Sequence, residues 1–113
     1  MLVRQDAILL RIVVDQYHYH DGKPLAECLL LRARDLMLQS GIVVQGRMGF
    51  ISPETGSAPM LRGRAWDSPV IIEFVDSPEK IKSLITVCED LLLSARMSTQ
   101  EVTSFHREAS GAH

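Results

Sequence analysis

The chain has 113 residues, of which 46% are hydrophobic and 23% are charged, and its formal net charge is −2. These values are typical of one soluble globular domain and argue against a dedicated nucleic-acid-binding protein, which would carry a basic surplus. No apolar run approaches the roughly 20 residues needed to span a bilayer. The two cysteines, Cys28 and Cys88, supply no disulfide framework. We therefore expect a cytoplasmic protein with no nucleic-acid partner and no membrane insertion.

The first expected elements are a strand and a helix. Residues 8–14 are rich in β-branched side chains and apolar on both alternating faces, which indicates a buried strand; the run is too short and too charged for a signal peptide. Residues 15–22 form a polar loop. Pro24 then suits the first position of a helix, whose apolar stripe continues to Met37, and Gly41 is the expected stop.

The rest of the chain predicts three strands, a loop and a second helix. They are expected at 42–51 (strand), 52–67 (long loop with two prolines and two glycines), 70–75 (strand), 77–92 (helix beginning at Ser77 and Pro78) and 95–105 (weak strand). We expect one domain over 1–105 and a flexible tail over 106–113. The order β-α-β-loop-β-α-β predicts an α+β ferredoxin-like sandwich, with a four-stranded antiparallel sheet and two helices on one face.

Two helices cover only one face of such a sheet. Strand alternation places Leu9, Val13, Val43, Ile71 and Val75 on the other face. Leaving about five such side chains in water would forgo on the order of 8–15 kcal/mol, which rivals the whole stability of a domain. We therefore expect a homo-oligomer with the sheets packed inward.

A family resemblance runs from about Ile8 to Val102. The segments LLRIVVDQYHYHDGKPLAE, GIVVQGRMGF and SPVIIEFVDSPEKI resemble the uncharacterised PII-like (GlnB-like) family of small prokaryotic proteins. The resemblance implies a ferredoxin-like homotrimer in which residues 46–67 correspond to the T-loop of PII signalling proteins. In those proteins, adenine nucleotides and metabolites bind in clefts between subunits, and the loop engages or releases a partner such as a membrane transporter.

One segment departs from the PII pattern. PII proteins have a glycine- and lysine-containing phosphate loop between the second helix and the fourth strand. Here residues 93–96 contain no glycine and one positive charge. A bound anion would therefore be held by other residues.

Basic and glycine residues around the long loop are the candidates for that role. Arginine offers a fixed fork of donors to phosphate or carboxylate, and glycine allows close approach of the backbone. The alternative is a solvated loop, with glycines that serve only strand twisting. The expected ligand-binding residues are Lys23, Gly46, Arg47, Gly49, Arg62 and Arg64. The ligand would be a small anionic effector, with an adenine nucleotide among the candidates, and no cofactor is assigned.

Other side chains are weaker candidates. His18, His20 and Asp21 form an H-x-H-D cluster that could hold a divalent metal, but a third ligand would have to come from elsewhere. Trp66 could stack on a base or pack the loop onto the sheet. Glu73 lies inside an apolar strand and needs a partner, at a subunit boundary or in an arginine such as Arg11.

No nucleophile elbow, Walker loop or paired metal motif is present, so we assign no catalytic residue. We expect a PII-like regulatory protein and not an enzyme, in which effector binding switches the loop that contacts a partner protein. The alternatives are a divalent-metal-binding trimer that uses His18 and His20, and a small enzyme with a site shared between subunits.

Overall fold

The computed structural model describes residues 1–51, 68–93 and 95–108. Its elements are β1 (Leu2–Asp15), β2 (Tyr19–His20), β3 (Lys23–Pro24), α1 (Leu25–Asp35), β4 (Ser40–Gln45), β5 (Pro69–Asp76), α2 (Pro78–Val87), the 3-10 helix η1 (Glu89–Leu91) and β6 (Arg96–Arg107). The expected long loop at 52–67 lies outside the described residues. No described helix is long and apolar enough to cross a membrane.

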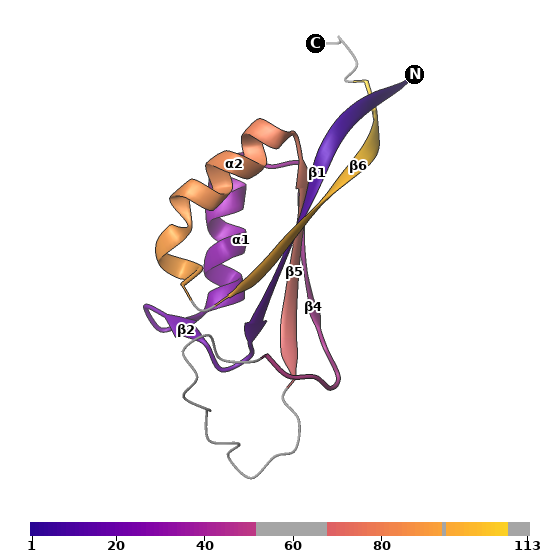
Figure 1. Ribbon diagram of the computed structural model, residues 1–113. Coiled ribbons are helices and arrows are strands. Elements are labelled where there is room, and N and C mark those ends of the chain that lie inside the picture. The colour runs from indigo at the N-terminus through magenta and orange to yellow at the C-terminus, as the bar shows by residue number, and fades with distance from the viewer. Residues whose placement is uncertain (52–67, 94, 109–113) are drawn as a thin grey trace.

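The four long strands form one antiparallel sheet in the order β4-β5-β1-β6. Figure 1 shows α1 and α2 side by side on the same face of this sheet. The arrangement confirms the predicted α+β ferredoxin-like fold. We call the covered side the helix face and the opposite side the open face.

The strands differ in length from the sequence expectation. β1 begins at Leu2, six residues before the expected start, because the backbone of residues 2–7 pairs with β6 alone. β6 correspondingly runs to Arg107, so the first two residues of the expected tail belong to a strand. The result is a two-stranded extension at the end of the sheet where β1 begins and β6 ends (Figure 1), and a molecule that measures 57 × 26 × 22 Å.

The end of α1 also differs from the expectation. Met37, with a φ of 61°, ends the helix, and Gly41 lies in β4. The N–H of Leu38 donates to the carbonyl of Ala33, and the N–H of Met37 donates to that of Arg34. This is the Schellman pattern, which usually has glycine where Met37 stands. The Lys80 ammonium, from α2, caps the carbonyl of Leu36 at 2.6 Å.

The start of α2 follows the prediction. The hydroxyl of Ser77 accepts a hydrogen bond from the N–H of Lys80, and Pro78 is the first helical residue. The buried carboxylate of Asp76 accepts hydrogen bonds from the backbone N–H groups of Ser77 and Gln39, at 2.6 and 2.9 Å. Asp76 thus joins the start of α2 to the segment that enters β4.

Alternation along the strands separates the core from the open face, as predicted for β1 and β5. The largest fully buried side chains come from both central strands, from both helices and from the residue that follows α2: Phe74, Leu10, Ile12, Leu25, Leu29, Ile72, Leu84, Val14 and Cys88. Partners in the ladder project to the same side of a sheet. The open face therefore contains Leu9, Arg11, Val13, Ile42, Val44, Ile71, Glu73 and Val75.

The side chains of β4 were predicted on the wrong faces of the sheet. Val43 pairs with Ile72, whose side chain is fully buried, so Val43 projects to the helix face. Ile42 and Val44 occupy the open face instead, each about half exposed. The apolar character of both faces of this strand concealed the correct assignment in the sequence.

Candidate functional site

The predicted ligand residues that the structure describes lie around one pole of the molecule, where β1 and β4 end and β5 begins. The side-chain amide of Gln45 donates to the Gln16 side-chain oxygen at 2.9 Å and to the Ser68 carbonyl at 3.1 Å. Since Gln16 follows β1 and Ser68 precedes β5, Gln45 ties three strand ends together.

Both predicted glycines at this pole pack against Pro69. The N–H of Gly46 donates to the Pro69 carbonyl at 2.7 Å. A Cβ at Gly46 would lie 2.9 Å from that oxygen, and one at Gly49 would lie 3.1 Å from Pro69 Cγ. The close approach leaves Arg47 exposed between the two glycines. Arg62 and Arg64, like Trp66, lie outside the described residues.

Lys23 lies on a small hairpin that follows β1. β2 and β3 pair His20 with Lys23 across Asp21 and Gly22, whose φ values are 52° and 78°. Two positive φ values in a two-residue connection are typical of a type I′ turn, which Asp-Gly favours. That dipeptide was a readable hairpin signal in a segment that we expected to be an irregular loop.

The H-x-H-D cluster lies on the same hairpin. His20 Nε2 is 3.4 Å from Asp21 Oδ2. Within the described ranges, no three or more His, Cys, Asp or Glu side chains gather in a way that could hold a metal ion. A metal bound by His18 and His20 would thus need a further ligand from outside these ranges or from another copy.

An ion pair that the sequence analysis missed joins the two helical segments. The Arg32 guanidinium, from α1, donates to both carboxylate oxygens of Asp90 in η1, at 2.6 and 3.0 Å, and to the Val87 carbonyl at 2.7 Å. These hydrogen bonds lower the pKa of Asp90 and raise the pKa of Arg32. The partners are 58 residues apart, so no local pattern indicated them.

The 3-10 helix η1 contains two acidic residues, Glu89 and Asp90, and β6 begins at Arg96. Of the two carboxylates, that of Asp90 is paired with Arg32.

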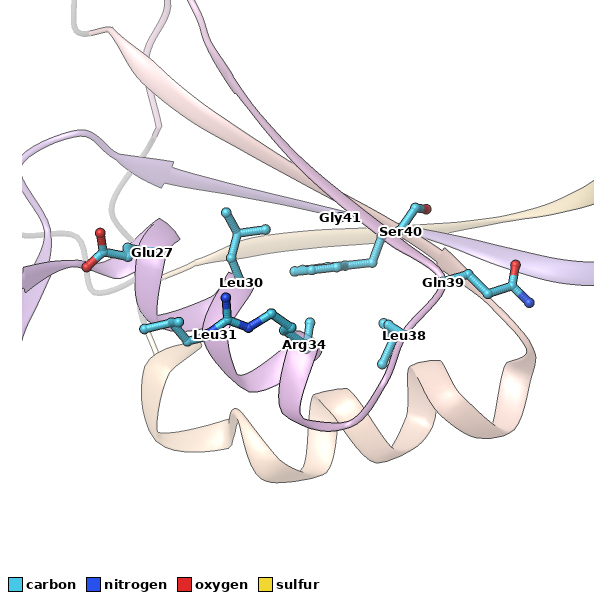
Figure 2. A pocket seen from close by; sticks show the side chains of 10 residues that line it. Glu27, Leu30, Leu31, Arg34, Leu38, Gln39, Ser40 and Gly41 are labelled. Carbon is cyan, nitrogen blue, oxygen red and sulfur yellow. The ribbon is translucent and has the colours of Figure 1, made fainter. Parts of the chain in front are cut away.

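A separate groove lies between α1 and β4 (Figure 2), with a volume of about 570 Å³. Its apolar lining includes Leu30, Leu31, Leu38 and Phe74, and Arg34 projects beside it from α1. None of the predicted ligand residues lines this groove.

A family model described as "Uncharacterized ACR, COG1993" (DUF190) matches residues 7–104. The chain belongs to this family. No curated protein sequence matches the DUF190 chain.

Several solved structures with a similar fold are described as PII-like proteins. CPII from Thiomonas intermedia K12, a nitrogen regulatory PII-like protein solved with ADP, AMP and bicarbonate, is 11% identical with a TM-score of 0.64, covering 95% of the DUF190 chain and 100% of CPII. A provisionally assigned PII-like signaling protein from Thermus thermophilus is 14% identical with a TM-score of 0.59, covering 89% and 91%. CutA from Synechococcus elongatus PCC7942 is 12% identical with a TM-score of 0.58, covering 92% and 85%. The PII-like resemblance of the sequence is thereby confirmed at the level of the fold.

Proposed function

We propose that this DUF190 protein is a PII-like regulatory protein that binds a small anionic effector, with adenine nucleotides as the first candidates, and that it is not an enzyme. The observation that carries the proposal is the likeness to CPII, a PII-like protein of the same fold that was solved with ADP, AMP and bicarbonate.

The pole where β4 ends is the proposed effector site. Lys23 and Arg47 are both exposed there, and neither has a hydrogen-bond or ion-pair partner in the part of the chain that the structure describes. An ammonium and a guanidinium that bind nothing within the described residues suit a phosphate or a carboxylate. Arg62 and Arg64 remain sequence candidates for the same site. Because residues 93–96 contain no glycine and one positive charge, these residues would take the role of the PII phosphate loop.

Self-association belongs to the same proposal. The open face carries six aliphatic side chains, of which Ile42 and Val44 are 52% and 47% exposed and the other four are partly buried. An exposed apolar sheet face of this kind usually marks a surface that another protein chain covers. We propose a cytoplasmic homotrimer with inward-facing sheets and effectors in the clefts between subunits. The segment 46–67 would contact a partner protein, a membrane transporter for example.

Isothermal titration calorimetry with ADP, AMP and bicarbonate tests effector binding. Replacing Lys23 or Arg47 by alanine should weaken binding about 10- to 100-fold, the usual value of a hydrogen bond to a charged group. Lys82→Ala, on the exposed side of α2, is the matched control and should leave affinity unchanged. The proposal fails if none of the three compounds binds, or if the Lys23 and Arg47 variants bind like the wild type.

A further inference from the structure

An ion pair lies in the middle of the apolar open face. Arg11 in β1 is the direct ladder partner of Glu73 in β5. Arg11 Nε donates to Glu73 Oε2 at 2.7 Å, and Arg11 Nη2 lies 2.6 Å from the same oxygen. The side chains are 44% and 24% exposed, so water still reaches both charges in a single copy.

Aliphatic side chains border this pair on three strands, and Ser98 of β6 is the other ladder partner of Arg11. Leu9 and Val13 flank Arg11 along β1, Ile71 and Val75 flank Glu73 along β5, and Ile42 of β4 is the ladder partner of Glu73. The next charged residues on the face stand at its border: Asp15 at the end of β1, and Arg96 at the start of β6. Packing another surface onto the face would therefore remove Arg11 and Glu73 from water together.

We propose that the Arg11–Glu73 pair sets the specificity of the contact between copies of this chain. This inference depends on the self-association proposed above. The two charges neutralise each other within one chain, so the centre of the open face offers no unpaired charge to an ionic partner. The open face of a second copy, which is equally apolar, is a suitable surface to cover it. Any arrangement that separates the two side chains leaves a buried, uncompensated charge, which is strongly unfavourable, whereas an intact buried pair is tolerated. The pair thus selects arrangements that keep it intact.

Sedimentation equilibrium of four proteins tests the proposal: wild type, Arg11→Leu, Glu73→Leu and the double variant. Each single variant should raise the dissociation constant of the oligomer on the order of 100-fold or more, because one charge stays buried without its partner. The double variant should associate at least as tightly as the wild type, because leucines replace both charges. Circular dichroism melts verify that every variant is folded.

The two single variants should respond differently to acid. In Arg11→Leu the remaining carboxyl can take up a proton, so lowering the pH from 7 to 5 should restore part of the association. In Glu73→Leu the guanidinium keeps its charge at both values, and no recovery is expected. Neither Asp15 nor Arg96 is altered, and the wild type measured at both pH values corrects for their contribution. Asp90→Asn, which breaks an ion pair in the helix layer, is the matched control and should leave association unchanged.

The outcomes separate the two proposals. An oligomeric wild type whose single variants associate equally well overturns the role of the ion pair and leaves self-association intact. If the double variant associates as weakly as the single variants, the proposed role of the ion pair is also wrong. If the wild type stays monomeric at all concentrations, both the proposed assembly and the role of the ion pair are wrong. Effector binding is tested separately by calorimetry.

Discussion

Gly41 and Phe74 meet more closely than a side chain at position 41 would permit. A Cβ on Gly41 would lie 2.7 Å from Cε1 of the Phe74 ring and 3.2 Å from Cδ2 of Leu30. Phe74 is fully buried at the centre of the core, and Leu30 belongs to α1. The absence of a side chain at Gly41 therefore lets β4 lie directly over the ring, beside the groove of Figure 2.

Replacing Gly41 by alanine should destabilise the protein by about 1–3 kcal/mol, the usual cost of overpacking a core. Urea unfolding followed by circular dichroism measures the change. Ser40→Ala, at the neighbouring exposed position, is the control and should change stability by less than about 0.5 kcal/mol. Equal stability of Gly41→Ala and wild type would show that Phe74 and Leu30 can move aside at no cost.

Replacing Met37 by glycine should stabilise the protein by about 1 kcal/mol. Met37 ends α1 with a positive φ, which costs a residue with a side chain energy that glycine avoids. Its side chain is 80% exposed, so little burial is lost. Met37→Ala keeps the backbone penalty and should show no gain in the same urea titration. A destabilised Met37→Gly protein would contradict the assignment of this helix end.

Asp90→Asn should lower the melting temperature at pH 7 by a few degrees and have a smaller effect near pH 2. The hydrogen bonds from Arg32 hold the pKa of Asp90 below its ordinary value, so the pair stabilises the fold above the unfolded pKa of about 3.9. That stability is lost as the pH falls through the lower, folded pKa. Calorimetric melts at both pH values measure the difference, and a deficit that is equally large in acid would show that the carboxylate's charge is not the cause.

Cys88 should resist thiol reagents in the folded protein. Burial raises the pKa of its thiol, and the side chain is fully inaccessible. In a Cys28→Ser background, Cys88 should react with Ellman's reagent at least about tenfold more slowly in buffer than in guanidinium. Equal rates would mean that the end of α2 opens readily. A Cys88→Ser protein reports the half-buried Cys28 for comparison.

Some features of the site were readable in the sequence and others were not. The Arg11–Glu73 pair was among the anticipated partners, since a carboxylate within an apolar strand requires a compensating charge. The face of the sheet to which Val43 projects could not be predicted, because β4 is apolar on both faces. Only the pairing of Val43 with Ile72 decides it. The Arg32–Asp90 pair depends on how two helical segments pack, and no spacing within either segment encodes it.

The order of strands and helices, the two-faced apolar sheet and the start of α2 followed from the sequence alone, because periodicity and capping are local properties of neighbouring residues. Tertiary structure decided the rest: the extension of β1 and β6, the end of α1 at Met37, and the placement of Lys23 and Arg47 around one pole. Each depends on ladder pairing or packing between residues far apart in the chain, where the energy of contact outweighs local preference.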